Sequence, residues 1–242
     1  MKSEIVTYGM GKLTAEGVLV YDDKVRHKRP AVLMAPNWLG LTDHAIERAK
    51  LVAGDRYVVF VADMYGQGIR PADFNEAATL ANPLRENAHE QRQRIRSAYT
   101  TMLDKAGKRN LIDHRRAAIG FCFGGGNVLE LARDGADVAA VVSIHGDLKT
   151  AEAAKPGAIK AALLVTHGAP DPVVPKADRD AFEQEMEAAG AKWQMLVFSG
   201  VLHAYTDEGV HIPGVAAWNE PATRTTYALT QRFIADAFAG SL

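Results

Sequence analysis

RAAIGFCFGGGNVLELAR, at residues 116–133, is the most informative segment of the chain. Residues 116–120 form a short, largely apolar run that is typical of a buried strand, and residues 126–133 have the apolar spacing of a helix. The turn between them, GFCFG, places small residues two positions before and two positions after Cys122. A sharp strand-to-helix turn of this kind is the cysteine form of a nucleophile elbow. The pattern predicts that Cys122 stands exposed above a sheet, at the N-terminus of a helix.

Such a position suits a thiol nucleophile. The first N–H groups of the helix and its dipole favour negative charge on the sulfur, and the N–H of Phe123 can donate to a developing oxyanion. Two other interpretations exist for the segment itself. Glycine-rich turns also occur in dinucleotide-binding folds, and a lone cysteine is most often a small buried hydrophobic residue. Residues elsewhere in the chain must decide between these interpretations.

The alternation of strand and helix continues on both sides of this segment. Short apolar runs predict strands at residues 31–35, 57–62, 116–120, 138–144, 161–166 and 193–198. Longer segments predict helices at residues 43–53, 84–106, 126–133, 176–189 and 220–238. We expect an antiparallel hairpin from residues 3–21 and one long irregular loop at residues 63–83. Alternation of this kind implies an α/β fold with a mostly parallel central sheet, flanked by helices on both faces, in a single domain spanning residues 1–242.

An acid and a histidine follow the elbow, each just after a predicted strand. Asp171 lies in the turn HGAPDPVVP after the strand at residues 161–166, and His203 lies in GVLHAY after the strand at residues 193–198. Sites in open α/β sheets form at the carboxyl ends of the strands. The order Cys122, Asp171, His203 is the nucleophile, acid and base order of the α/β-hydrolase fold. Alone, an aspartate in a turn or a histidine in a loop is unremarkable, but together the three strand ends predict a catalytic triad.

The roles of the three residues follow from their chemistry. We expect His203 to take the thiol proton of Cys122 or to pair with the thiolate, and Asp171 to orient the imidazole and stabilise its charged form. His203 then protonates the leaving group and activates the water that releases the acyl group.

These motifs resemble the dienelactone hydrolase family, a cysteine-nucleophile branch of the α/β hydrolases. The resemblance covers about residues 30–238 and lies in GFCFGGG at residues 120–126, DMYG at 63–66, HGAPDPVVP at 167–175 and LHAY at 202–205. It implies a hydrolase that cleaves a small carboxylic ester or lactone through a thioester on Cys122. It also implies that neither a metal nor an organic cofactor takes part.

Two features depart from the family pattern. The family has a glutamate after the first core strand that helps to deprotonate the cysteine, and the matching residue here is Asn37, whose amide cannot act as a base. Asn37 could instead hydrogen-bond the thiol or the substrate. The N–H of the next residue, Trp38, matches the second oxyanion donor of the family. These matches leave open a second hypothesis, a catalytically impaired relative that binds or senses a small ester or electrophile.

The second departure concerns the arginines that grip a substrate carboxylate in dienelactone-cleaving members. The stretch after the histidine reads HAYTDE, at residues 203–208, and is acidic. A second family arginine maps loosely onto Arg92, Arg94 or Arg96. We therefore expect a neutral ester or a different lactone as substrate. Four aromatic residues either wall an acyl pocket or belong to the core: Trp38, Tyr65, Phe121 and Phe123.

Composition argues against several other classes of protein. The 242 residues include 28 Lys and Arg against 29 Asp and Glu, without the clustered basic face of a nucleic-acid binder. The single cysteine allows no internal disulfide. No apolar run approaches the roughly 18 residues of a membrane span, and residues 1–13 lack the apolar region of a signal peptide. We expect a cytoplasmic protein, monomeric or a small homo-oligomer. A Rossmann-type nucleotide site would need G-x-G-x-x-G after the first core strand, where PNWLG stands instead.

Overall fold

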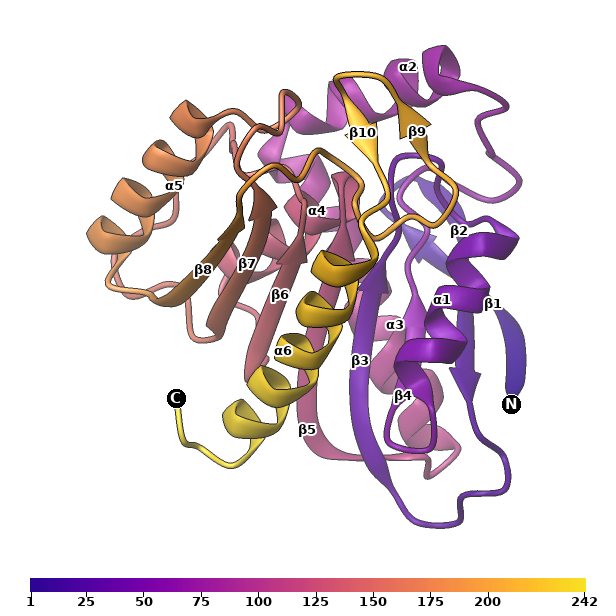
Figure 1. Cartoon of the computed structure of the whole chain (residues 1–242). Helices are drawn as coiled ribbons and strands as arrows, with labels where there is room; N and C mark the ends of the chain where they lie inside the picture. Colours follow the sequence, from indigo (N-terminus) through magenta and orange to yellow (C-terminus); the bar gives the residue numbers. More distant parts are fainter.

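An eight-stranded sheet runs through the centre of the computed structural model, which describes all 242 residues (Figure 1). Its strands stand in the order β1-β2-β4-β3-β5-β6-β7-β8. They are β1 (Lys2–Met10), β2 (Leu13–Tyr21), β3 (Arg29–Ala35), β4 (Val58–Val61), β5 (Ile112–Phe121), β6 (Ala140–Ile144), β7 (Ala162–Gly168) and β8 (Lys192–Phe198). β2 pairs antiparallel with β1 and with β4, and all other neighbours are parallel. The predicted α/β-hydrolase fold and its antiparallel edge hairpin are therefore confirmed.

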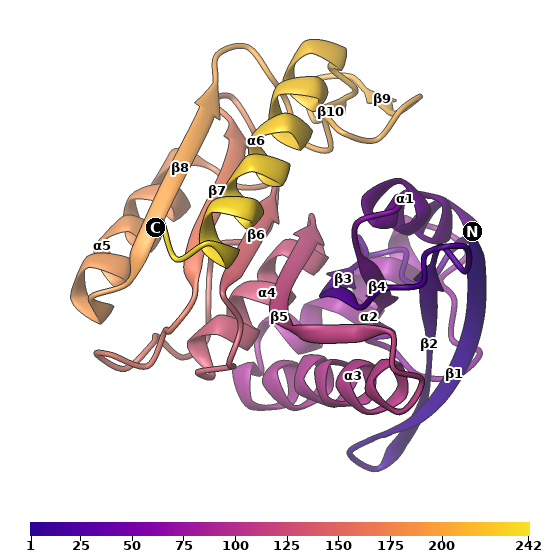
Figure 2. The same ribbon diagram turned by 90° about the horizontal axis from the view of Figure 1, so that it is seen from below.

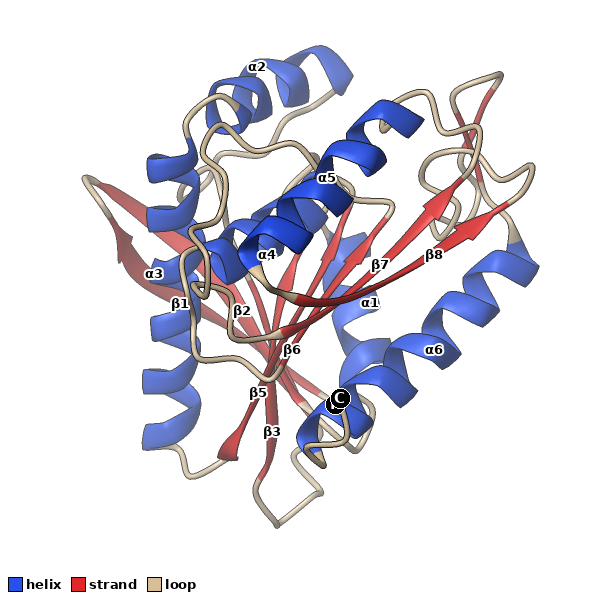
Figure 3. Ribbon diagram, turned by 90° about the vertical axis from the view of Figure 1, so that its left-hand side faces the viewer, coloured by secondary structure: helices blue, strands red, loops and turns tan.

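Helices cover both faces of this sheet (Figure 2, Figure 3). One face carries α1 (Asp43–Ala53) and α6 (Glu220–Phe238), and the other carries α3 (Ala88–Lys108), α4 (Phe123–Arg133) and α5 (Lys176–Ala189). Each face has its own apolar cluster, with 23 buried residues on the α1 and α6 side and 41 on the other. Because both faces are covered, the central strands are apolar throughout, as in β3, where all seven residues are buried.

The predicted loop at residues 63–83 was wrong in its second half, which forms the helix α2 (Phe74–Arg85). Asp73 caps this helix by accepting from the N–H groups of Asn75 (2.8 Å) and Glu76 (2.9 Å). Glu76 in turn accepts from the N–H of Ala72 at 2.9 Å, which completes a reciprocal capping arrangement. Pro83 lies inside the helix near its C-terminal end. The long helix predicted from residue 84 consequently begins only at Ala88, and Asn87 caps it.

The carboxyl ends of the parallel strands meet at the upper edge of the sheet in Figure 1, beneath α2 and a small hairpin. This hairpin pairs β9 (His211–Ile212) with β10 (Ala216–Ala217), elements too short to leave a periodic signal. Its backbone holds His203 on both sides: the His203 N–H donates to the Val215 carbonyl at 3.2 Å, and the Ala217 N–H donates to the His203 carbonyl at 3.1 Å. The hairpin thus fixes the loop that follows β8.

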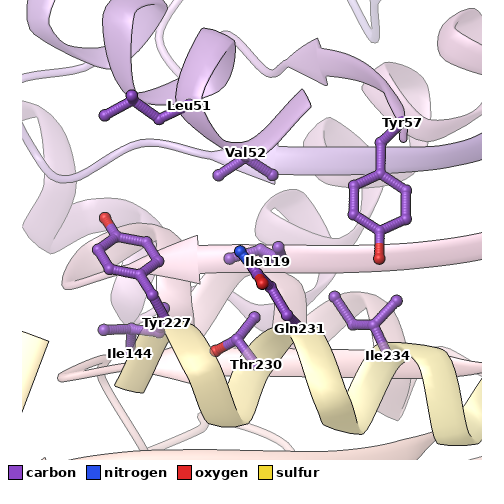
Figure 4. Close-up of a pocket in the computed structure, with 9 residues that line it drawn as sticks. All are labelled: Leu51, Val52, Tyr57, Ile119, Ile144, Tyr227, Thr230, Gln231 and Ile234. Atoms are coloured by element: carbon purple, nitrogen blue, oxygen red, sulfur yellow. The ribbon is translucent and has the colours of Figure 1, made fainter. Parts of the chain in front are cut away.

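A cavity of about 260 Å³ lies between α1 and α6 (Figure 4). Its lining is mainly apolar and consists of Leu51, Val52, Tyr57, Ile119, Ile144, Tyr227, Thr230, Gln231 and Ile234. None of the predicted triad residues lines it, so it belongs to the packing of the two helices rather than to the predicted site. No helix is both long and apolar enough to cross a membrane.

Candidate active site

Cys122 stands between β5 and α4 in a left-handed backbone conformation, with φ 52° and ψ −121°. Non-glycine residues rarely adopt a positive φ, and strain of this kind concentrates at functional sites. The glycines on either side are required by crowding: a Cβ on Gly120 would collide with the backbone of Gly124, and one on Gly124 would collide with the carbonyl of Ala35. The elbow predicted from the sequence is therefore present.

The sulfur is less accessible than the elbow pattern predicts. Cys122 is only 8% exposed, because it belongs to the same apolar cluster as Tyr65 and Phe123. The prediction that it stands exposed above the sheet was wrong in this respect.

The structure brings the three predicted triad residues together. His203 Nε2 lies 3.2 Å from Cys122 Sγ, and His203 Nδ1 lies 2.8 Å from Asp171 Oδ2. The second carboxylate oxygen of Asp171 accepts from the N–H groups of Val173 (2.8 Å) and Val174 (3.1 Å). All three side chains are buried, and each comes from the carboxyl end of a different strand. This arrangement can transfer a proton from sulfur to imidazole while the carboxylate holds the ring in place.

The charges in this chain of contacts favour an ionised pair. Burial alone lowers the pKa of His203, but the charge on Cys122 and the hydrogen bond to Asp171 outweigh it and raise that pKa above its ordinary value. Burial also acts to raise the pKa of Asp171, yet its histidine neighbours and backbone N–H donors hold it well below the usual range. These neighbours therefore favour the ionised forms of Asp171 and His203 over the neutral forms.

The two N–H groups predicted to bind an oxyanion lie on segments that touch. Phe123 is the first residue of α4, so its N–H has no acceptor inside the helix. Trp38 lies in a turn in which the N–H of Gly40 donates to the Asn37 carbonyl at 2.9 Å, while its own N–H makes no hydrogen bond within the protein. The close contact between Gly124 and the carbonyls of Ala35 and Pro36 presses this turn against the start of α4.

Asn37, at the position of the family glutamate, does not contact the thiol. Its Nδ2 donates to Asp207 Oδ2 at 3.3 Å, and its Oδ1 accepts from the N–H of Leu39 at 3.0 Å. Both ends of the amide are thus engaged away from Cys122. The expectation that Asn37 could hydrogen-bond the thiol is not met in this structure.

The four aromatic residues separate into two groups. Trp38 stacks on Phe74 of α2 with ring centroids 5.5 Å apart, and Tyr65 stacks on Phe123 at 5.9 Å. The Tyr65 hydroxyl donates to the Trp38 carbonyl at 2.7 Å, which ties the two stacks together beside Cys122. Phe121, in contrast, is fully buried in the cluster beneath α1 and α6 and belongs to the core.

The three arginines considered from the sequence lie on α3, and each of them forms an ion pair. Arg92 binds Glu130, Arg94 binds Glu90, and Arg96 binds Asp134. Each arginine is therefore committed to a structural partner, and none of them contacts a triad residue.

The arginine near the thiol is Arg85, which sequence reasoning missed. Its Nε donates to Asp147 Oδ2 at 2.6 Å, and its guanidinium lies 5.2 Å from the centroid of the Phe123 ring. Burial lowers the pKa of Arg85, but Asp147 and the Cys122 sulfur outweigh this and raise it. Arg85 was overlooked because residues 84–106 were expected to be one helix. The capping residues Asp73 and Glu76 were the signal for the separate helix whose last turn carries it.

Two further histidines lie behind the triad. His145 Nε2 contacts Thr206 Oγ1 at 2.8 Å, and its ring meets the ring of His203 edge to face at 5.3 Å. Burial lowers the pKa of His145 to about 3. His167 Nδ1 lies 3.9 Å from Asp171 Oδ2, too far for a hydrogen bond, and burial lowers its pKa as well. No group of three or more potential ligand side chains forms a metal site.

Comparison with known proteins identifies the family and agrees with the fold. A family model described as the dienelactone hydrolase family matches residues 15–236. A solved structure named m3DLH is 31% identical, with a TM-score of 0.90 and 98% of both chains covered. Another, described as a dienelactone hydrolase-like promiscuous phosphotriesterase from metagenomic libraries, is also 31% identical, with a TM-score of 0.88 and the same coverage. A protein of Escherichia coli strain K12, provisionally named a carboxymethylenebutenolidase, is 22% identical over 73% of this chain and 67% of its own.

Proposed function

The chain belongs to the dienelactone hydrolase family, and from that premise we propose that it hydrolyses a small carboxylic ester or lactone through an acyl-enzyme on Cys122. The observation that carries the proposal is the unbroken line of contacts from Asp171 through His203 to Cys122, at 2.8 Å and 3.2 Å. These distances lie within or close to the range for direct proton transfer between the three groups.

In the first half of the reaction, the Cys122 sulfur attacks the carbonyl carbon, and its electron pair forms the new C–S bond. The carbonyl π electrons move onto oxygen, where the N–H groups of Phe123 and Trp38 donate to the oxyanion. Collapse of this intermediate breaks the C–O bond to the leaving group, which takes a proton from His203 Nε2. A thioester on Cys122 and a free alcohol result; in a lactone the alcohol stays attached to the acyl group.

In the second half, a water molecule takes the place of the leaving alcohol. His203, now neutral, accepts a proton from this water, whose oxygen attacks the thioester carbonyl. The second intermediate expels the Cys122 thiolate and leaves a carboxylic acid. Asp171 stays ionised throughout and stabilises the imidazolium each time it forms.

The charges around the site favour a neutral substrate. Arg85, the arginine near the thiol, already binds Asp147, and the acidic stretch after His203 contributes Asp207, which already binds Arg48. Since both arginines already have a carboxylate partner, neither is free to hold a substrate carboxylate. The aromatic surface of Trp38, Tyr65 and Phe123 instead suits a small apolar acyl group.

A hydrolysis assay with p-nitrophenyl acetate tests the proposal. We expect a burst of p-nitrophenol equal to the enzyme concentration, together with an acetyl adduct on the peptide containing Cys122, detected by mass spectrometry. Cys122→Ala and His203→Ala abolish both signals, because each removes a participant in acylation. A wild-type protein that is folded but gives neither burst nor adduct contradicts the proposal and favours the impaired relative considered from the sequence.

A substrate panel then narrows the class. We expect short acyl esters and small neutral lactones to be turned over faster than esters with a free carboxylate. A phosphotriester belongs in the panel because one structural relative is described as a promiscuous phosphotriesterase. Faster turnover of carboxylate-bearing esters would contradict the preference for a neutral substrate.

A further inference from the structure

The two departures from the family pattern touch each other, although they lie 170 residues apart in the chain. Asn37 replaces the family glutamate, and Asp207 lies in the acidic stretch where the family has an arginine. Asn37 Nδ2 donates to Asp207 Oδ2 at 3.3 Å. An amide that donates to a carboxylate is a favourable pair, whereas a glutamate at position 37 would set a second carboxylate against the first.

The Asp207 carboxylate is anchored from a third segment. Arg48 of α1 donates to Asp207 Oδ1 at 2.7 Å and to the Thr206 carbonyl at 3.2 Å. Arg48 and Asp207 are each only 6% exposed, so the charge of the arginine acts with little screening by water. Burial alone raises the pKa of Asp207, but the charge of Arg48 outweighs it and holds that pKa below its usual range.

This cluster connects the two loops that supply the proposed chemistry. Asp207 closes the turn after His203, in which its N–H donates to the Ala204 carbonyl at 2.9 Å. Ala204 has a φ of 52°, a conformation that needs support from its surroundings. Asn37 precedes Trp38, whose N–H is the second oxyanion donor. The 3.3 Å hydrogen bond therefore runs from the loop of the base to the loop of the oxyanion donor.

We infer that Asn37 and Asp207 form a matched amide–carboxylate pair that positions His203 and the Trp38 N–H relative to Cys122. The inference rests on the proposed function, because those two groups act only if Cys122 is acylated. Neither residue touches the thiol, so both are positioning residues. Asn37 therefore contributes to the proposed reaction by positioning these groups. It is not an inert replacement for a catalytic base.

The arrangement requires one amide and one carboxylate. Arg48 can neutralise one negative charge, and a second carboxylate within about 3.3 Å of the first would stay uncompensated in a buried place. The two loops would then separate. Small displacements of groups that hold reacting atoms can cost about a hundredfold in rate.

The test exchanges the two side chains. Asn37→Asp is isosteric and keeps the acceptor for the Leu39 N–H, but it replaces the amide donor with a carboxylate oxygen, so the hydrogen bond to Asp207 becomes a repulsion. We expect its burst rate constant to fall about tenfold or more, with a smaller change in KM. In the double variant Asn37→Asp/Asp207→Asn the hydrogen bond runs in the opposite direction and the total charge is unchanged. We expect this double variant to recover to within about threefold of the wild type.

Two further variants complete the design. Asn37→Glu lowers the burst rate if the pair is matched but raises it if position 37 merely lacks a base. Glu185→Gln weakens another ion pair, that of the buried Arg133 with the partly buried Glu185, in which Glu185 Oε2 lies 2.8 Å from the guanidinium. It is expected to lower the denaturation midpoint and leave the burst rate unchanged, so it separates loss of stability from loss of positioning.

The inference is overturned if Asn37→Asp or Asn37→Glu is as fast as the wild type or faster, or if the double variant is no faster than Asn37→Asp. Should the single variant fail to fold, a folded and active double variant still supports the exchange. Alkylation of Cys122 by iodoacetamide separates this inference from the proposed function, since it needs no hydrolysis. If the wild type gives no burst, the pair is still supported when alkylation is slower in Asn37→Asp than in the wild type and recovers in the double variant. Equal alkylation rates in all variants overturn the inference.

Discussion

The imidazoles of His203 and His145 lie edge to face at the carboxyl end of the sheet, with ring centroids 5.3 Å apart. Both are buried, but their surroundings shift their pKa values in opposite directions. His203 lies between an anionic carboxylate and a sulfur, and these partners raise its pKa although burial opposes them. His145 meets the neutral hydroxyl of Thr206, and burial lowers its pKa to about 3. The surroundings thus favour the charged form of one imidazole and the neutral form of the other.

The difference shows that burial does not decide the protonation of a histidine in this site. His203 and His145 are both buried, at 6% and 0% exposure, yet only the first has a charged partner within hydrogen-bond distance. Asp171 supplies that charge. His145 instead connects to Asp207 through Thr206, whose hydroxyl donates to the Asp207 carboxylate at 3.4 Å. One region is suited to proton transfer and the other to holding the loop in place.

The largest expected effect comes from replacing each histidine in turn. His203→Gln removes the group that takes the thiol proton, so we expect kcat/KM for p-nitrophenyl acetate to fall by about a thousandfold or more. His145→Gln keeps a donor for Thr206, and we expect a loss of less than about tenfold. Equal losses in the two variants would mean that both rings take part in the chemistry.

Replacing Asp171 removes the charged partner of His203. The surroundings of His203 then resemble those of His145, which has no charged partner. Asp171→Asn is expected to lower kcat/KM by about a hundredfold or more, because the imidazolium loses its counter-charge. Since Asp171 raises the pKa of His203, the alkaline limb of the pH profile should also move to lower pH. Asp178→Asn, at a buried carboxylate 3.3 Å from Lys149, is the matched control and leaves the profile in place. An alkaline limb that stays in place in Asp171→Asn would contradict the assigned role.

The smallest effect is on stability, and the two histidines act in opposite directions. His145 stays neutral in the folded protein down to about pH 3, whereas an unfolded histidine takes up a proton near pH 6.5. The unfolded state therefore binds the extra proton between these values, and the free energy of unfolding falls as the pH drops below about 6.5. For His203 the folded state binds the extra proton, so its contribution is present below about pH 6.5 and is lost as the pH rises toward its raised pKa.

Urea denaturation of His145→Phe between about pH 4 and pH 7 measures the acid side of this balance. We expect the free energy of unfolding to decrease less steeply toward acid pH than in the wild type, by up to about 1.4 kcal/mol per pH unit. His167, which is also buried and has a lowered pKa, remains in the variant and retains its share of the slope. An unchanged slope would show that His145 does not stay neutral in the folded protein.

Much of this site could be predicted because its signals are local. The glycines beside Cys122 follow from the crowding of a strand-to-helix turn, and Asp171 and His203 each come directly after an apolar run. Such signals need only a few neighbouring residues. Helix α2 was missed because residues 63–83 were expected to form a loop, although it too has a local signal in the capping residues Asp73 and Glu76.

The sequence by itself determined most of the order of strands and helices, the elbow around Cys122 and the order of acid and base, since apolar periodicity and turn chemistry are properties of short segments. Tertiary structure alone decided that Asn37 meets Asp207, that Arg85 lies near the thiol, and that His145 is neutral beside His203. Each of these depends on where loops from different strands converge. No periodicity records that convergence, because residues up to 170 positions apart meet only when the sheet brings their strand ends together.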